Sequence, residues 1–439
     1  MTKRLEKFLF ILLLIFVPVQ TGKHFWPYFS YISGIRVDYL SPTFYIIDGI
    51  VLLLFLTFIF GRKFKAKKNT NSVFHSLKLL LSLVFILVIV LQIFIARQVS
   101  AHVLFALRIC EFLFLGYFAS VFLTRKKLSL LIYSLSFGGI FSSLLAVWQF
   151  LNQSSIGGIF YFFGERTFSQ TTIGIAKINI GTAQFLRPYA TFPHPNVLAL
   201  FLLVVAILIL VRIEFEKNVL RKTFLIVSAI ASSAGLFLTF SRSIIICFLI
   251  IICVLFFQRF HGKIQRMLFA LAILPVTVLY FFLSFPRFSI TPFLLKDLSL
   301  RNDLLNIGVN IFSKYPVFGV GLNNFFYYEN AYQKIISPVF LQPIHNIYFL
   351  ALVQLGVVGF IPILAFLFFS VKILFKKTFR QKNREIRQFY LGVFLLLIAS
   401  LVIGFSDHFL ITLEQGMLLF ALLFGLAWSN IGGTSKESN

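Results

Sequence analysis

Long apolar runs separated by short polar segments make up most of this chain. Each run is about long enough to cross a hydrocarbon core of roughly 30 Å as a helix. The ten-residue alternation of apolar and polar positions that is typical of membrane strands does not occur. The pattern therefore predicts an all-α polytopic membrane protein. We expect about twelve transmembrane helices, near residues 6–20, 44–60, 77–96, 102–123, 128–151, 196–212, 223–240, 243–259, 267–285, 346–372, 388–406 and 412–429.

The charged residues predict the orientation of these helices. Only 12% of the residues are charged, against about 25% in soluble domains, and the formal net charge is +26. With a cytoplasmic N-terminus, 27 of the 40 Lys and Arg residues fall in cytoplasmic segments. The positive-inside rule then predicts that both termini are cytoplasmic. Because the bilayer explains the basic residues, we expect no nucleic-acid partner.

The remaining segments define the expected organisation. We predict one integral-membrane domain over residues 1–439. An extracytoplasmic loop spans 152–194, and a large extracytoplasmic loop with short helices of its own spans 286–345 in the C-terminal third. A tight extracytoplasmic turn at 239–243 joins two predicted helices. Residues 431–439 are small and polar, and we expect them to form a disordered cytoplasmic tail.

The first candidate site residues surround the start of the helix near residue 196. His194, Pro195 and Asn196 mark that start, because proline suits the first turn of a helix. The N–H groups there attract anions, and Arg187 lies a few residues upstream. These features suit an anionic ligand. A helix cap beside an arginine that reaches the membrane interface explains them equally well.

The tight turn at 239–243 carries the second candidate. Arg242 is the only charge between two apolar runs, and Ser241 or Ser243 can cap the following helix. An arginine held so close to the bilayer can donate two hydrogen bonds to a phosphate. The alternative is an interfacial arginine that contacts lipid headgroups.

The large loop carries the third candidate. Arg301 can bind phosphate or pair with Asp303. Gly319 and Gly321 permit a sharp turn and close backbone approach.

The fourth candidate stands where the chain re-enters the membrane. His345 and Asn346 precede the predicted helix at 346–372. The positive end of that helix favours a neutral imidazole, which can accept a proton from a hydroxyl group. Alternatively, His345 donates a hydrogen bond to an anion, or simply lies in the interface beside a capping Asn346.

These candidates predict one basic site. Arg187, Arg242, Arg301 and His345 come from distant parts of the chain, and the predicted topology places all four on the outer face. No HExxH, DxD, CxxC or Walker pattern accompanies them, so the sequence indicates neither a metal nor a nucleotide cofactor. We therefore expect a phosphate-attracting site beside the bilayer.

Four motifs in order resemble those of the O-antigen ligase and O-antigen polymerase superfamily. The long outer loop in the C-terminal third also matches. The motifs are Arg187 with Thr191-Phe-Pro-His-Pro-Asn196, Thr239-Phe-Ser-Arg-Ser243, Pro316-Val-Phe-Gly-Val-Gly-Leu-Asn-Asn-Phe325, and His345-Asn-Ile-Tyr348 with Gln354-Leu-Gly-Val-Val-Gly359.

The resemblance implies a membrane glycosyltransferase with a fold similar to the GT-C class. Such enzymes lie in the bacterial cytoplasmic (inner) membrane and act at its extracytoplasmic face. They pass a glycan from undecaprenyl diphosphate to an acceptor hydroxyl group, and they use neither metal nor cofactor. Direct attack by the acceptor would invert the anomeric carbon, and we expect an inverting enzyme.

The resemblance also implies roles for single residues. Arg187 and Arg242 would hold the donor diphosphate, and His345 would act near the reacting carbon. Arg301 matches the arginine usual in the outer loop, although Leu-Leu-Asn replaces the aromatic residue that often follows it nearby. The residues in supporting positions are His194, Asn196, Ser241, Asn346, Gly319 and Gly321.

Several alternatives stay open at this point. A ligase and a polymerase differ in the acceptor, which is a glycolipid, a protein or a second glycan. A transporter of lipid-linked glycans also has about twelve helices, but typically shows repeats and mid-membrane charges, and here only Arg108 and Glu111 are clearly intramembrane. The base is His345 or one of the predicted outer carboxylates Asp38, Asp48, Glu165, Asp297, Asp303, Glu329 and Asp407.

Overall fold

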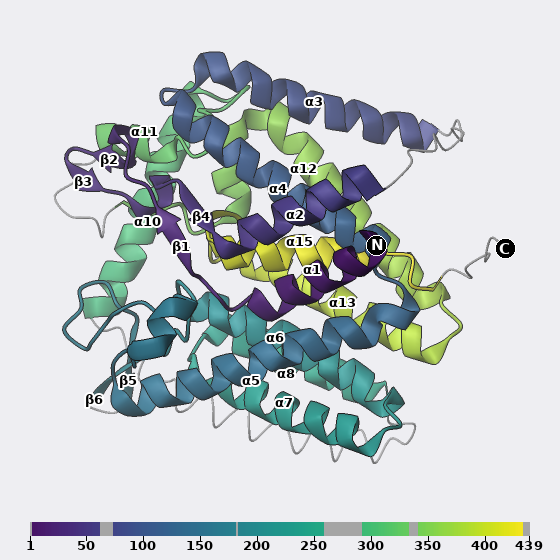
Figure 1. Ribbon diagram of the computed structural model, residues 1–439. Coiled ribbons are helices and arrows are strands. Elements are labelled where there is room, and N and C mark those ends of the chain that lie inside the picture. The colour runs from purple at the N-terminus through teal and green to yellow at the C-terminus, as the bar shows by residue number, and fades with distance from the viewer. Residues whose placement is uncertain (1, 62–72, 181–182, 259–291, 333–340, 433–439) are drawn as a thin grey trace.

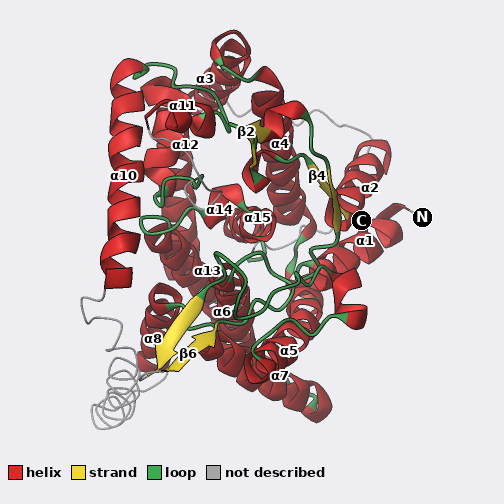
Figure 2. Ribbon diagram, turned by 90° about the vertical axis from the view of Figure 1, so that its left-hand side faces the viewer, coloured by secondary structure: helices red, strands yellow, loops and turns green. Residues whose placement is uncertain are grey.

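The computed structural model describes residues 2–61, 73–180, 183–258, 292–332 and 341–432. Long helices run roughly side by side, and the short strands gather at one end of them, while α1 begins at the other end (Figure 1). Figure 2 looks onto the strand-bearing end, where α10 lies lengthwise along the face. The described part of the chain is therefore mostly helical, with its irregular segments concentrated at one end.

The helices and strands have the following bounds. The helices are α1 (Thr2–Phe16), α2 (Ile46–Gly61), α3 (Val73–Ile95), α4 (Val99–Phe122), α5 (Leu128–Asn152), α6 (Pro195–Arg212), α7 (Val219–Leu238), α8 (Arg242–Phe257), α10 (Pro292–Lys314), α11 (Phe325–Tyr332), α12 (Ile347–Arg380), α13 (Arg384–Ile403), α14 (Phe409–Thr412) and α15 (Glu414–Trp428). The strands are β1 (Gly22–His24), β2 (Tyr31–Ile32), β3 (Ile35–Arg36), β4 (Thr43–Tyr45), β5 (Lys177–Ile180) and β6 (Ala183–Leu186).

Six helices among the described residues are long and apolar enough to cross a membrane. Four further apolar helices are shorter, and α1 belongs to neither group. The predicted span at 267–285 lies outside the described residues. The chain is thus a membrane protein with at least several spans, and the count of about twelve stays a prediction. The six helices lie at Val99–Phe122, Arg125–Asn152, Pro195–Phe215, Val219–Leu238, Ile347–Arg380 and Arg384–Ile403.

Helix α6 forms the centre of one half of the molecule. It is apolar on all sides, and nearly every residue from Val197 to Ile209 is buried. A helix without a polar face must be enclosed, and α5, α7, α8 and α13 pack around it. This enclosure holds the first residues of α6 in place at the strand-bearing end.

The strands pair locally in the outer segments predicted from the sequence. β1 pairs with β4, β2 with β3, and β5 with β6, each as a two-stranded antiparallel ribbon. Isolated ribbons of this size are marginal on their own, so they depend on the helices beneath them.

Helix α12 is broken at Gly356, and the loop from Pro316 to Gly321 is bonded into the break. Gly356 has a φ of 64°, which is not helical. The N–H of Val357 donates to the carbonyl of Pro316 at 2.9 Å, and the N–H of Gly321 donates to the carbonyl of Gln354 at 2.9 Å. A broken helix leaves backbone groups without partners, and here the loop supplies them. The break therefore anchors the loop that follows α10 to α12.

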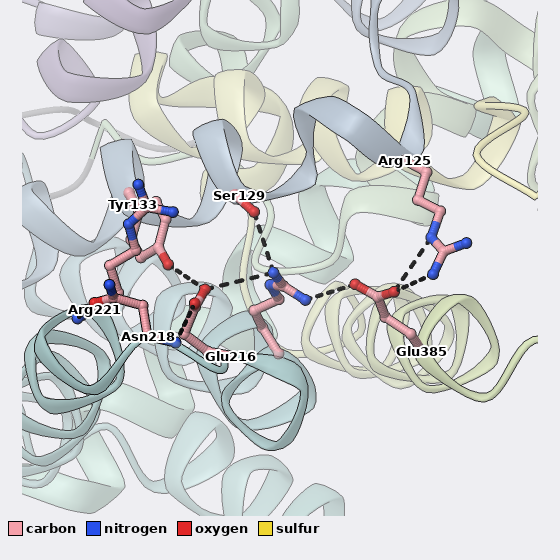
Figure 3. Close-up of polar contacts among 8 residues, drawn as sticks. Arg125, Ser129, Tyr133, Glu216, Asn218, Arg221 and Glu385 are labelled. Atoms are coloured by element: carbon pink, nitrogen blue, oxygen red, sulfur yellow. Dashed lines mark hydrogen bonds and ion pairs between the residues drawn. The ribbon is translucent and has the colours of Figure 1, made fainter.

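A polar network ties helices together at the end opposite the strands (Figure 3). The carboxylate of Glu385 accepts hydrogen bonds from Arg125 at 2.7 Å and from Arg212 at 2.6 Å. Arg212 also lies 3.5 Å from Glu216, whose carboxylate accepts a hydrogen bond from the hydroxyl of Tyr133. The network thereby joins the turn that leads into α5, the last turn of α6 and the first turn of α13.

We expect that Gly356→Ala strongly destabilises the protein. A Cβ at Gly356 would collide with the backbone carbonyl of Val317, and its positive φ disfavours any side chain. The expected loss exceeds about 2 kcal/mol, measured as a lower melting temperature in detergent. Gly34→Ala is the matched control, because Gly34 has a φ of 78° with nothing within 4 Å, and we expect a loss of only about 1 kcal/mol there. Equal losses in the two variants would contradict this role of the break.

We expect that Glu385→Gln also lowers the melting temperature. The change removes the charge between Arg125 and Arg212, and Arg212 is only 15% exposed. The expected loss is about 1–3 kcal/mol. Glu214→Gln is the control, because its ion pair with Arg384 is largely exposed and such pairs contribute about 0–1 kcal/mol. A Glu385 variant as stable as the Glu214 variant would show that the network does not hold the helices.

Candidate functional site

One cavity of about 2270 Å³ lies at the strand-bearing end of the helices. Its lining includes residues from the N-terminal strands, the 152–194 segment, the starts of α6 and α8, and the segment that precedes α12. Most of the residues singled out in the sequence line it, although they come from distant parts of the chain. These are Arg187, His194, Asn196, Ser241, Arg242, Arg301 and His345.

Arg187 is held by backbone and side-chain acceptors from two other segments. Its Nε donates to the carbonyl of Thr239 at 2.7 Å, and its Nη2 donates to Oδ1 of Asn196 at 2.7 Å. The first bond reaches the turn between α7 and α8, and the second reaches the first turn of α6. The position of the Arg187 guanidinium is therefore set by the relative placement of these helices.

Asn196 connects Arg187 to a carboxylate that follows α13. While its Oδ1 accepts from Arg187, its Nδ2 donates to Oδ2 of Asp407 at 2.7 Å. The other oxygen of Asp407 accepts from the backbone N–H of His408 at 2.8 Å, and the His408 ring lies 2.6 Å from the hydroxyl of Thr412. A continuous chain of hydrogen bonds thus runs from the α7–α8 turn to α14.

The start of α6 is built as the sequence indicates. His194 occupies the N-cap position, where its Nδ1 accepts from the backbone N–H of Asn196 at 3.1 Å, and Pro195 fills the first turn. This cap orients the amide of Asn196 toward Arg187 and Asp407.

Arg242 is the first residue of α8 and follows a compact turn. Phe240 has a φ of 50°, and the hydroxyl of Thr239 accepts from the backbone N–H of Ser241 at 3.2 Å. Ser241 stands at the N-cap position, but its side chain makes no capping hydrogen bond. The expectation that a serine side chain caps α8 is not met at Ser241, because Thr239 organises this turn instead. The half-buried Arg242 side chain lines the cavity.

His345 lies beside the Asp407–His408 segment. Its ring centroid is 5.0 Å from that of His408 in an edge-to-face arrangement. Asn346 caps α12, because its Oδ1 accepts from the N–H groups of Tyr348 and Phe349 at 3.0 Å. Asn346 itself does not line the cavity.

Arg301 reaches the same region from α10. Its Nη1 lies 3.5 Å from the carbonyl of Ser406, at the long end of the range for a hydrogen bond. Arg301 and Asp303 both line the cavity. The carbonyl of Ser406 adjoins Asp407, so this arginine approaches the segment that Asn196 and His345 also contact.

Gly319 and Gly321 are placed elsewhere. They lie in the loop that enters the break of α12 and do not line the cavity. A Cβ at Gly319 would collide with the backbone of Gln354 and Gly356. Their contribution to the site is therefore indirect, through anchoring of the large outer segment.

His194 and His408 are neutral near pH 7. Burial, reinforced by the neighbouring charge of Arg187, lowers the pKa of His194 to about 4. Burial also lowers the pKa of His408 to about 4, although Asp407 opposes that shift. Burial acts to raise the pKa of Asp407, but His408, His194, His345 and the hydrogen bond from Asn196 together bring it below its usual value. Asp407 is therefore ionised, and the positive charge of the site comes from its arginines.

Sequence reasoning missed part of this arrangement. Asp407 was one of several unranked carboxylates, and His408 was not considered at all. Arg166 also lines the cavity, and its Nη1 donates to the carbonyl of Pro193 at 3.3 Å. Asp407 and His408 form a polar dipeptide between two apolar runs, and this pattern could have indicated a functional role. Arg166 is a lone arginine in a polar loop, and no sequence pattern distinguishes it. The side chain of Asp297 lies outside the described part of the structure.

Among the described residues, no group of three or more His, Cys, Asp or Glu side chains is arranged to hold a metal ion. Chemically, the site offers arginines from α8, α10 and the loop after β6 beside an ionised carboxylate and an imidazole. Such a set suits an anionic ligand with an adjacent proton-transfer step.

We expect the free energy of unfolding to fall as the pH is lowered from about 6.5 to about 4. The pKa of His408 is about 4 in the folded chain, and its ordinary value is 6.5, so the unfolded chain binds more protons in this window. The loss from this group approaches about 3 kcal/mol. Melting temperatures of the detergent-solubilised protein between pH 4 and 8 measure it. His408→Gln should make the curve less steep, while the equally lowered pKa of His194 keeps part of the slope. An unaltered curve in that variant would contradict the assignment.

Comparison with known proteins finds one family model that matches part of this chain. No curated protein matches the chain. The family model described as O-antigen ligase matches residues 227–364, a segment that contains Arg242, Arg301 and His345 but neither Arg187 nor Asp407. This match confirms the resemblance of the chain to the O-antigen ligase superfamily.

Proposed function

We propose that this protein is a membrane glycosyltransferase that moves a glycan from undecaprenyl diphosphate to an acceptor hydroxyl group at the extracytoplasmic face. The observation that carries the proposal is one cavity lined by Arg187, Arg242, Arg301 and His345. The match to the O-antigen ligase family supports a lipid-linked glycan as the donor class.

The three arginines form the binding site for the donor diphosphate, and we call them the arginine wall (Arg187, Arg242 and Arg301). A guanidinium donates paired hydrogen bonds to phosphate oxygens, and it keeps its charge at any physiological pH. Arg187 is oriented by Thr239 and Asn196, so its charge is positioned before the donor binds. Such preorganisation lowers the cost of stabilising charge later in the reaction.

The reaction breaks the bond between the anomeric carbon and the diphosphate oxygen. The diphosphate leaves with the bonding electron pair, and the arginine wall stabilises the negative charge that develops on it. One such donor contributes about 3 kcal/mol, or roughly a hundredfold in rate. The reaction then needs no metal ion at the diphosphate.

The acceptor hydroxyl forms the new glycosidic bond, and its proton passes to the base. We assign His345 as the base, and Asp407 as the carboxylate that stabilises the resulting imidazolium. The ring of His345 lies against that of His408, and the charge of Asp407 interacts with His345. Direct attack by the acceptor inverts the anomeric carbon. The fold is then of the GT-C type, with about twelve helices.

In the proposed topology, the protein lies in the inner membrane of a bacterial cell, and both of its termini are in the cytoplasm. Asn196 and Arg212 lie at opposite ends of α6, about 24 Å apart along its axis. The basic network around Arg212 is then cytoplasmic, in agreement with the positive-inside rule, and the cavity is extracytoplasmic.

We expect that Arg242→Ala and His345→Ala each lower the rate of glycan transfer at least a hundredfold, because one removes charge stabilisation and the other removes the base. The measurement is release of undecaprenyl diphosphate from its lipid-linked glycan by the reconstituted protein, with EDTA present. Arg384→Ala is the control, since Arg384 lies on the opposite end and is 58% exposed. All three variants should insert and melt like the unaltered chain. Retained transfer in both site variants would overturn the site assignment.

A polymerase of the same superfamily is the second candidate, and it differs only in its acceptor. Mass spectrometry of cellular glycoconjugates after gene deletion separates the two. Unattached chains of normal length indicate a ligase, whereas short chains indicate a polymerase.

A further inference from the structure

A further arginine of the 152–194 segment, Arg166, lines the cavity with an exposed side chain. Its one hydrogen bond to a described residue runs from Nη1 to the carbonyl of Pro193 at 3.3 Å. Among the described residues, no carboxylate pairs with Arg166, whereas Arg108 in the same cavity pairs with three carboxyl groups. A guanidinium has five N–H donors, so most of those of Arg166 are available to a ligand.

The residue before Arg166 is anchored inside the protein. Glu165 is buried, and its carboxylate accepts hydrogen bonds from the N–H of Ile156 at 2.8 Å and from the N–H of Gly157 at 2.7 Å. Its Oε1 also accepts from Nε2 of Gln149, which lies in the last turn of α5, at 2.6 Å. The Arg166 side chain therefore extends from a backbone position that is fixed.

The same glutamine holds the backbone that follows Arg187. Oε1 of Gln149 accepts from the N–H groups of Tyr189 at 3.0 Å and Ala190 at 2.7 Å, and its Nε2 donates to the carbonyl of Ala190 at 3.0 Å. A side-chain amide has two acceptor and two donor positions, and the buried amide of Gln149 uses all four. Ala190 has a φ of 49°, which is unfavourable for a residue with a side chain, and these bonds hold it there.

A small apolar cluster lies between the two segments that carry Arg166 and Arg187. Phe168, Leu186 and Tyr189 are buried together, and the ring centroids of Phe168 and Tyr189 are 5.1 Å apart. Burial raises the pKa of the Tyr189 hydroxyl, and a backbone hydrogen bond and the charges of Arg187 and Arg166 oppose that shift. Both guanidinium groups thus act on one side chain, and they belong to one electrostatic site.

We propose that Arg166 binds the diphosphate of the donor together with Arg187, and that the buried pair of Gln149 and Glu165 sets the positions of both arginines. This inference rests on the proposed function and adds a cationic residue to the arginine wall. Because the backbone beside each arginine is already fixed, less conformational freedom is lost when the anion binds. No bond is made or broken by Gln149 or Glu165, whose part is positioning.

Binding of geranylgeranyl diphosphate to the reconstituted full chain tests the role of Arg166. We expect Arg166→Ala to weaken this binding at least about tenfold, because it removes charge-assisted hydrogen bonds. Arg166→Lys should lose less, since it keeps the charge but not the forked geometry. Both variants should keep the melting temperature of the unaltered chain, because the side chain is exposed.

Arg36→Ala is the matched control for Arg166→Ala. Arg36 is also exposed and lines the cavity, but its guanidinium carbon lies 4.3 Å from the centroid of the Trp26 ring. We expect this variant to change the affinity about twofold or less. Equal losses in the two variants would show a general effect of charge and would overturn the assignment of Arg166. Unaltered affinity in Arg166→Ala would overturn it as well.

Glu165→Gln tests the positioning by a change of sign. The removal of a negative charge would by itself strengthen the binding of an anion. The amide, however, brings N–H donors to a site where the N–H groups of Ile156 and Gly157 already point, so it displaces the backbone before Arg166. We expect binding of geranylgeranyl diphosphate at least about threefold weaker than in the unaltered chain, and no further loss when Arg166→Ala is already present. Unaltered or tighter binding contradicts the positioning role.

Gln149→Met removes the hydrogen bonds and keeps a side chain of similar length. We expect a lower melting temperature and weaker diphosphate binding, and the loss of affinity should be at least about threefold smaller when Arg166→Ala is present. Gln92→Met is the control, because Gln92 is equally buried and donates to backbone carbonyls away from the cavity. It should lower the melting temperature and keep the affinity. If Gln149→Met does not fold, the Glu165 variant decides the question.

Failure of this inference can be told apart from failure of the proposed function. If the unaltered chain does not bind geranylgeranyl diphosphate, or Arg242→Ala binds it equally well, the donor site is wrong and this inference falls with it. If Arg242→Ala loses the binding and Arg166→Ala keeps it, the donor site stands and only this inference is overturned.

Discussion

The amide of Asn196 is the contact on which the candidate site depends. One end of it accepts a hydrogen bond from Arg187 and the other donates to Asp407, so a single planar group links a cation to an anion. This arrangement separates the two charges by a fixed distance and prevents a direct ion pair. Because Arg187 is also bonded to Thr239, the amide connects α6, the α7–α8 turn and the segment after α13. The site is therefore a property of several helices packed together.

The rest of the structure holds the contacts of Asn196 with Arg187 and Asp407 in place. Helix α6 is enclosed by other helices over most of its length, so the Asn196 end cannot move without displacing the core. At its far end, Arg212 is bonded to Glu385 on α13, the helix that leads to Asp407. The break of α12 at Gly356 anchors the loop that follows α10, and α10 carries Arg301. Helices α6 and α10 and the segment after α13 are thus each tied to the rest of the structure at a second point.

The electrostatics of the cavity follow from the same packing. At the arginine wall, charge comes from guanidinium groups, because the imidazoles of His194 and His408 are neutral near pH 7. Arg108, which also lines the cavity, is instead paired with Asp48, Glu111 and Glu414.

The sequence alone determined the local features of this protein. Apolar periodicity, the Pro195 first turn and the Asn346 cap depend on neighbouring residues, and so the helices and several of their ends were predictable. The topology argument also predicted that Arg187, Arg242, Arg301 and His345 share one face. Only the tertiary structure decided which polar groups meet. Asp407 faces Asn196 across 211 positions, Glu414 joins Arg108, and Gly319 enters the break of α12. These contacts depend on how helices distant in sequence pack together. Hydropathy does not predict that packing, because many arrangements of the helices bury the same apolar surface.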